Sequence, residues 1–198
     1  MRILHITNNF PTLNFPIFGI FIKEQIESLN HLGVENEVFF INSREEGKGA
    51  YLRSLWKLRR LLRRNHYDII HCHHSYSGMI FLLSGRWVGT RRLLSYQSDP
   101  RNEGGILLFK LLYLFFNRII LKNKPRDEKR VKVVHLPNGV NTSFFVPMDK
   151  DHCKDKLGLN KSKRYILFMD SYNRRPCKRI DRYSRTLSIL REKYHHYD

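Results

Sequence analysis

The chain contains few cysteines. Its 198 residues include Cys72, Cys153 and Cys177, and these three lack any paired spacing. An odd, unpaired set is typical of proteins in a reducing compartment, so we expect a cytoplasmic protein without structural disulfides.

Long apolar runs are also scarce. The longest, residues 106–121, is interrupted by Lys110, Asn117 and Arg118, whereas a membrane-spanning helix needs about 20 predominantly apolar residues. We therefore expect a buried helix followed by a strand here, not a transmembrane segment. The first residues run directly into an apolar segment that lacks the parts of a secretory signal, so we expect no such signal.

Acidic residues are half as numerous as basic ones. The sequence has 18 Asp and Glu against 36 Lys and Arg, which gives a formal net charge of +18. This excess predicts attraction to polyanions, whether nucleic acid, anionic lipid or phosphate-bearing substrates, and composition alone does not choose among them. A hydrophobic content of 41% is sufficient for a packed core.

Short apolar strands alternate with helical segments along the chain. The expected strands are 2–7, 38–41, 67–72, 93–96, 118–121, 131–136 and 165–169, and the expected helices are 20–32, 51–64, 75–85, one from 106, 150–157 and 180–194. Strands that are apolar on both faces are typical of a parallel sheet covered by helices on both sides. The predicted fold class is α/β, a Rossmann-like doubly wound sheet, in which ligands bind at the loops that follow the strands.

Residues 51–64 predict a basic amphipathic helix with Trp56 near the boundary between its faces. The apolar face carries Tyr51, Leu55, Leu58 and Leu62. The cationic face carries Arg53, Lys57, Arg60 and Arg64. This pattern suits a helix that lies on an anionic lipid surface. It suits equally a core-packed helix whose cations meet water.

Two loops that follow predicted strands could bind an anion. NNFPTLNFPIFG ends in Gly19 at a helix start, where glycine permits close backbone approach and the first helical amides are free; a plain tight turn is the alternative. SYNRRPCKR places Arg174, Arg175 and Lys178 where a diphosphate could be held; a solvated run of charges is the alternative.

The segment DIIHCHHSYSG places His71, Cys72, His73 and His74 at the end of a strand. Adjacent strand residues point to opposite faces, so at most two of the four could converge on one metal, and we predict no metal site. We expect a polar site wall in which His73 or His74 donates to a substrate hydroxyl or phosphate. Structural histidines are the alternative.

The segment HLPNGVNTSFFVPMD is either a surface loop or a hinge between two domains. Pro137 fixes φ and Gly139 permits a turn. We expect Phe144, Phe145 and Pro147 to pack the crossing segment onto a domain face.

Together these segments resemble the retaining GT-B glycosyltransferases of family four, over nearly all of the chain. The resemblance is carried by MRILHIT, FGIFIKEQIESLNHLGV, YDIIHCHHSYSG, LPNGVNTSFFVP and YILFMD…RRPCKR. LPNGVNTSFFVP is similar to the family's interdomain linker, with Asn141 where aspartate is usual. The resemblance implies an acceptor-side Rossmann-like domain over 1–136, a linker over 137–149 with Pro137, Asn138 and Gly139, and the first βα unit of an incomplete donor-binding domain over 150–198.

The resemblance also implies the chemistry. The activity would be hexosyl transfer with retention, from a nucleotide sugar to a lipid-linked, membrane-associated or polysaccharide acceptor, without cofactor or metal. The residues that bind the donor phosphates would be Gly19, Arg174, Arg175 and Lys178. The acceptor-side residues would be His73, His74, Asp99 and Arg101. The catalytic residue is unassigned, with His73 and Asp99 as candidates, because Tyr96 and Gln97 stand where many relatives carry histidine and glycine.

The paired-glutamate motif of the family's second domain is absent from the 198 residues. We therefore expect a truncated enzyme that transfers sugar poorly or not at all, cytoplasmic and peripheral to the inner face of the membrane. The alternative is a basic Rossmann-like module that contacts nucleic acid or anionic lipid without catalysis. Nucleic acid is the less favoured partner, because the aromatic residues fall in core-like positions and not among the basic ones.

Overall fold

A computed structural model describes residues 1–85, 89–123, 131–167 and 180–193. The chain divides into two compact units, Met1–Phe145 and Val146–Asp198. The boundary between them falls inside the stretch 137–149 that the sequence suggests as a linker.

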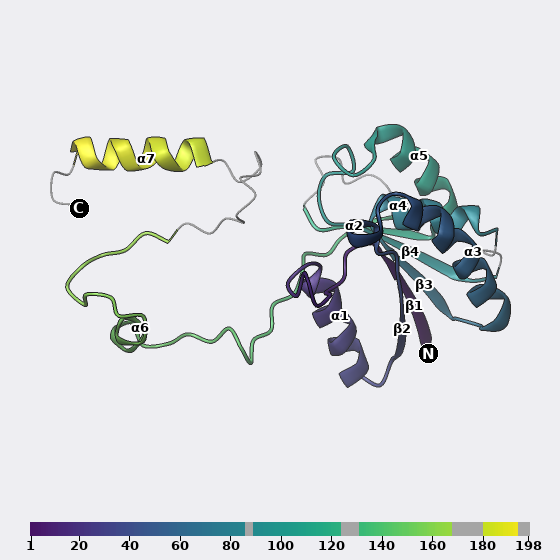
Figure 1. Cartoon of the computed structure of the whole chain (residues 1–198), viewed down its shortest axis with the longest axis horizontal. Coiled ribbons are helices and arrows are strands. Elements are labelled where there is room, and N and C mark those ends of the chain that lie inside the picture. The colour runs from purple at the N-terminus through teal and green to yellow at the C-terminus, as the bar shows by residue number, and fades with distance from the viewer. Residues whose placement is uncertain (86–88, 124–130, 168–179, 194–198) are drawn as a thin grey trace. The chain divides into compact units, whose positions relative to one another are not determined.

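The first unit is built on a six-stranded sheet in which all pairings are parallel (Figure 1). The strands are β1 (Arg2–Thr7), β2 (Glu35–Phe40), β3 (Ile69–His73), β4 (Arg91–Tyr96), β5 (Arg118–Leu121) and β6 (Val133–His135). Their order is β2-β1-β3-β4-β5-β6, which confirms the predicted doubly wound α/β fold.

The helices of this unit fall into two sets. They are α1 (Ile20–His31), α2 (Ser43–Glu46), α3 (Gly49–Arg64), α4 (Ser75–Leu83) and α5 (Gly105–Phe115). Along the sheet, β2 is added on one side of β1, whereas β3, β4 and β5 are added in turn on its other side. Because parallel crossovers are right-handed, α1 belongs on one face of the sheet and α3, α4 and α5 on the opposite face. Figure 1 shows α1 lying apart from these three helices.

The main hydrophobic core lies between the sheet and helices α3 to α5. Leu4, Ile70 and Leu94 point to this face and are fully buried against Leu58 and Phe81 of the helices. Burial of each such side chain contributes roughly 1.5–3 kcal/mol relative to exposure. The residues that alternate with them point to the other face, and several of these are polar: His5, Thr7, His71, His73 and Ser95 are all buried.

The apolar run 106–121 folds as predicted, into α5 followed by β5. Among the described helices, none is long and apolar enough to cross a membrane. Several other element bounds differ from expectation by up to three residues. Strand β2 begins at Glu35, and the four-residue helix α2 was not predicted at all.

The linker residues depart from their expected roles. Phe144 and Phe145 are exposed and contact each other edge to face, with ring centroids 5.0 Å apart. They therefore do not pack the segment onto a domain face, as the sequence suggested. Gly139 has no positive φ, and a Cβ there would meet nothing within 4 Å, so this conformation does not require glycine.

The second unit contains two helices in its described part, α6 (Lys150–Lys156) and α7 (Ile180–Lys193). Asp149 caps α6, because its carboxylate accepts a hydrogen bond of 2.8 Å from the backbone N–H of His152. The strand expected over 165–169 is absent from its described part, 165–167. A strand needs a neighbour for its backbone hydrogen bonds, and the described residues of this unit contain none. Arg174, Arg175 and Lys178 lie outside the described residues.

Candidate functional site

The candidate site lies at the carboxyl ends of β1, β3 and β4. The direction in which strands are added reverses between β1 and β3, where Thr7 pairs with His73. In open parallel sheets, ligands bind at such a switch point, in the crevice between the loops that leave the two strands. The loops concerned are 8–19 after β1, the turn at His74, and the segment that begins at Gln97.

The loop after β1 is fastened to helix α2. Thr12 Oγ1 and Asn14 Nδ2 donate hydrogen bonds of 3.3 and 2.7 Å to Glu45 Oε1. The guanidinium of Arg44 lies over the rings of Phe15 and Phe18, 4.2 and 4.7 Å from their centroids. Side-chain contacts with α2 thus hold the loop in place. Helix α2 is too short for a periodic sequence pattern to reveal it.

Gly19 ends this loop in a left-handed conformation, with φ 74°. A Cβ at this position would lie 2.4 Å from the backbone oxygen of Asn9. The loop's own backbone therefore requires glycine. Donor binding by Gly19 is a separate matter and stays a prediction.

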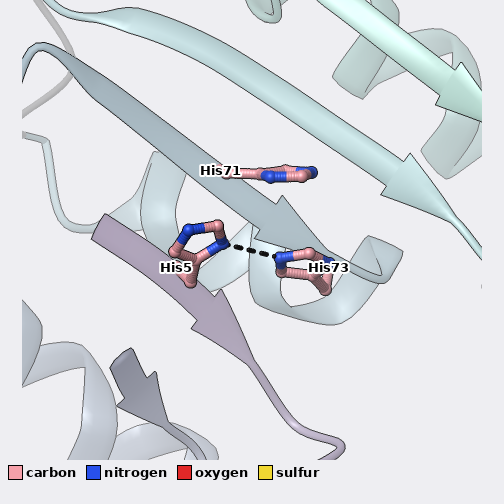
Figure 2. Close-up of side chains that lie close together, drawn as sticks. All are labelled: His5, His71 and His73. Atoms are coloured by element: carbon pink, nitrogen blue, oxygen red, sulfur yellow. Dashed lines mark hydrogen bonds between the residues drawn. The ribbon is translucent and has the colours of Figure 1, made fainter. Parts of the chain in front are cut away.

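Three histidines meet across the β1–β3 boundary. His5 on β1 and His71 on β3 are register partners, and His73 lies two residues further along β3 on the same face (Figure 2). Their side chains are buried, with exposed fractions of 0% for His5, 4% for His71 and 1% for His73. His5 Nδ1 lies 3.0 Å from His73 Nε2, and one ring nitrogen from each histidine lies within 4.8 Å of the other two. We call these residues the histidine cluster.

The protons of the histidine cluster can be placed by its hydrogen bonds. Asn36 Nδ2 donates to Asn30 Oδ1 and to the backbone oxygen of Val34, each at 2.8 Å, so Asn36 Oδ1 is the atom that accepts from His5 Nε2 at 2.9 Å. Neutral His5 then has a lone pair on Nδ1, which accepts a hydrogen bond from Nε2–H of His73. The remaining nitrogen of His73, Nδ1, is buried without a hydrogen-bond partner among the described residues.

Burial favours the neutral form of all three imidazole rings in the cluster. Burial lowers the pKa of His5 below its ordinary value. Burial, together with the positive charge of neighbouring histidines and of Lys122, lowers the pKa of His71 and of His73 much further. His71 Nε2 has a neutral partner, Ser95 Oγ, at 2.7 Å. His73 is thus enclosed in a packed network and does not form an open site wall.

A second polar group lies at the start of α4. His74 adopts a positive φ of 91°, an uncommon conformation for a residue with a side chain. Its Nε2 is 3.6 Å from Oε2 of Glu103, a carboxylate only 5% exposed. Oε1 of Glu103 accepts hydrogen bonds from the backbone N–H and the hydroxyl of Ser98. Burial lowers the pKa of His74, and the Glu103 charge partly offsets this effect.

Several polar atoms at the carboxyl ends of β3 and β4 and in the turn that follows β4 are buried and lack hydrogen-bond partners in the described part of the chain. They are His74 Nδ1, Tyr96 OH, Gln97 Nε2 and Glu103 Oε2. An unpaired buried polar atom costs about 1–3 kcal/mol, so such a group of donors and acceptors at a ligand-binding edge is well suited to receive a polar ligand. Glu103, which a turn brings back to Ser98, carries no signal in the sequence that marks it as a site residue.

Asp99 and Arg101 lie on that turn. Asp99 Oδ1 accepts a 2.8 Å hydrogen bond from the backbone N–H of Arg101, and both residues are exposed. The structure therefore separates the predicted acceptor-side residues into three places: His73 in the histidine cluster, His74 against Glu103, and this pair on the surface.

The predicted linker residues border a cavity of about 660 Å³ between α1 and residues 136–143. Lys122 and the acidic side chains Glu24 and Glu27 also line it. Asn138 Nδ2 lies 3.5 Å from Gln97 Oε1, which connects the linker to the loop after β4.

A doubly wound parallel sheet with polar groups gathered at its switch point defines the class of nucleotide-fold α/β domains. Within that class the comparison with known families is specific: the family description Glycosyltransferase Family 4 matches residues 23–121, from α1 to β5. The chain belongs to glycosyltransferase family 4, which confirms the resemblance carried by its motifs.

Two individual proteins are similar to the chain. The UDP-Gal:alpha-D-GlcNAc-diphosphoundecaprenol alpha-1,3-galactosyltransferase of Escherichia coli is 28% identical over 131 residues, covering 56% of this chain and 34% of the relative. The chain thus spans about a third of the length of this curated relative. A crystal structure of MurG from Acinetobacter baumannii matches with a TM-score of 0.46 and 10% identity, over 71% of this chain and 46% of that one.

Proposed function

We propose that this chain is the acceptor-side part of a glycosyltransferase that moves a sugar from a nucleotide-sugar donor to a lipid-linked acceptor. The family membership supports sugar transfer, and the name of the E. coli relative gives a UDP-sugar donor and a diphosphate-linked lipid acceptor. The observation that carries the proposal is the set of unpartnered polar atoms at the ends of β3 and β4 and on Glu103, all of which lie within the family match of residues 23–121.

In this proposal His74 and Glu103 bind a hydroxyl of the acceptor, and Asp99 and Arg101 contact its more exposed part. Tyr96 OH and Gln97 Nε2, at the end of β4, offer further hydrogen bonds. Catalysis in such an enzyme consists mainly of positioning and of charge stabilisation at the leaving diphosphate.

The donor diphosphate is proposed to bind Arg174, Arg175 and Lys178 together with the Gly19 loop. The proposed domains are 1–136 for the acceptor and 150–198 for the beginning of the donor domain, joined by 137–149. Retention of anomeric configuration belongs to this proposal as well.

Helix α3 supports a location at an anionic membrane surface. Leu58 is buried in the core, whereas Leu52 and Trp56, one turn apart, are 67% and 68% exposed. The surrounding exposed side chains of α3 are cations: Arg53, Lys57, Arg59, Arg60, Arg63 and Arg64. Exposed apolar side chains among cations suit the interface of an anionic bilayer, where each cation near the surface contributes about 1 kcal/mol. We propose that α3 holds the protein at the cytoplasmic face.

Vesicle flotation tests the acceptor and the membrane separately. Two vesicle sets have the same anionic charge, and one of them contains undecaprenyl-diphosphate-linked GlcNAc. We expect stronger binding to the second set. Glu103→Gln should abolish the difference and keep the charge-dependent binding, while Trp56→Ala should weaken binding to both.

Equal binding of the wild-type chain to both vesicle sets would contradict the proposed acceptor. Preference for RNA over anionic vesicles at matched salt would favour the alternative of a nucleic-acid-binding module. We also expect the 198-residue chain to transfer sugar from UDP-galactose to this acceptor poorly or not at all, which a radiolabel transfer assay measures.

A further inference from the structure

The residues proposed above to bind donor and acceptor leave the histidine cluster without an assigned role. It occupies the face of the sheet opposite the main hydrophobic core, in positions where alternation would place apolar side chains. Three buried imidazoles on two adjacent strands call for an explanation, because a buried polar group is stable only when its hydrogen-bonding capacity is used. One nitrogen, Nδ1 of His73, has no hydrogen-bond partner among the described residues.

The spacing of the cluster is that of a chelating set. His71 and His73 are two residues apart on β3 and so share a face, and His5 faces them from β1 (Figure 2). Zinc–nitrogen bonds of about 2.0–2.1 Å place the nitrogens of a tetrahedral site roughly 3.3 Å apart. His5 Nδ1 and His73 Nε2 are already 3.0 Å apart, and one ring nitrogen from each of the three histidines lies within 4.8 Å of the other two. Side-chain movements on the order of 1 Å would therefore complete the geometry.

The outer hydrogen bonds hold the rings in a suitable form. His5 donates Nε2–H to Asn36, and His71 has Ser95 at its Nε2, so the Nδ1 of each ring can serve as a ligand. Metal-binding histidines commonly use their second nitrogen in this way. His73 would transfer the proton on Nε2 to its own unpartnered Nδ1, which frees Nε2 beside His5 without net release of a proton.

We propose that His5, His71 and His73 form a binding site for a zinc-type transition-metal cation. Three neutral imidazole nitrogens suit Zn²⁺, Co²⁺ or Ni²⁺, whereas Mg²⁺ and Ca²⁺ prefer oxygen ligands. The sequence-based expectation of no metal site considered only the histidines of a single strand. Strand β1 supplies His5 as the third possible ligand. The proposal does not depend on the proposed sugar transfer.

Lys122 gives the proposal a distinguishing feature. Its charge acts on both His71 and His73, and a nearby ammonium opposes the binding of a dication. Lys122→Met should therefore bind the metal more tightly than the wild-type chain does, a change that binding at a remote surface site would not show.

The test is a metal titration of the full 198-residue chain after treatment with a chelator. We expect thermal unfolding to shift upward by roughly 5–10 °C when free Zn²⁺ exceeds its Kd a hundredfold. Added Mg²⁺ should give no shift. Co²⁺ should produce the visible absorption bands of a low-symmetry nitrogen site, a readout that is separate from stability.

His71→Gln should lose the Zn²⁺-dependent shift and the Co²⁺ bands, and a second variant, His5→Gln, guards against a substitution that fails to fold. His135→Gln is the matched control, because His135 is an exposed histidine on β6, and it should bind as the wild type does. Absence of both signals in the folded wild-type chain would overturn the proposal. Equal signals in His71→Gln would also overturn it, since the metal would then lie elsewhere.

Discussion

Two glycines with nearly the same backbone conformation allow a direct test of how the loop after β1 is built. Gly19 has φ 74° and Gly33 has φ 75°. A Cβ at Gly19 would lie 2.4 Å from the Asn9 backbone oxygen, whereas a Cβ at Gly33 would meet nothing within 4 Å. The substitutions Gly19→Ala and Gly33→Ala therefore share the backbone strain and differ in the steric overlap.

The expected losses follow from these two terms. A side chain in the left-handed region costs roughly 1–2 kcal/mol, and this is the whole effect expected for Gly33→Ala. The overlap at Gly19 involves main-chain atoms, which cannot rotate away as a side-chain end can. Overpacking of this kind costs typically about 1–3 kcal/mol, so Gly19→Ala should lose roughly 2–5 kcal/mol in total.

Urea unfolding followed by far-UV circular dichroism measures both variants. The midpoint should fall further for Gly19→Ala than for Gly33→Ala, with similar slopes. If both variants lose the same stability, the close approach of Gly19 to Asn9 is not what the native loop requires. The glycine would then have to be explained by ligand binding alone.

Three further outcomes are expected. Leu58→Ala, at a fully buried position of α3, should lower the free energy of unfolding by about 2–5 kcal/mol in the same urea assay. Leu52→Ala, on the exposed face of α3, should change it by no more than about 0.5 kcal/mol, and equal losses would contradict the assignment of faces. Cys72, buried and with its pKa raised by burial, should resist iodoacetamide in the native protein while Cys153 reacts, as peptide mass spectrometry would show; comparable rates would count against this packing. Hydrogen bonds from Asn42, the larger contribution, and from Asn14 lower the folded-state pKa of Glu45. The contribution of Glu45 to loop order is therefore present above the unfolded pKa of about 4.5 and is lost as pH falls through the lower folded value. Amide exchange in the loop after β1 should accelerate in that window for the wild-type chain and show no matching step in Glu45→Gln.

The periodic elements were predictable, because burial imposes their pattern on the sequence. Strand β5 and helix α1 lie where their apolar residues placed them. The start of strand β2 was predicted three residues too late, because Glu35, Asn36 and Glu37 conceal the start of an edge strand, which among the described strands pairs with β1 alone. Helix α2 has four residues, fewer than a periodic signal needs.

The side-chain clusters were less predictable, because they depend on strand order and on turns. His5 looks isolated in MRILHIT, and it meets His71 only because β1 and β3 are neighbours in register. The order β2-β1-β3, once assumed, would have given that pairing. Glu103 approaches His74 across the turn 98–103, and its burial could not be foreseen from a polar loop sequence.

The attachment of the loop after β1 to α2 affects how a ligand would be bound there. A chain segment that is fixed only on binding loses conformational freedom at that moment, and the affinity falls accordingly. Here the interactions of Arg44 and Glu45 have already restricted the segment during folding. A molecule that enters this side of the crevice would meet a preorganised surface, and more of its contact energy would remain as affinity.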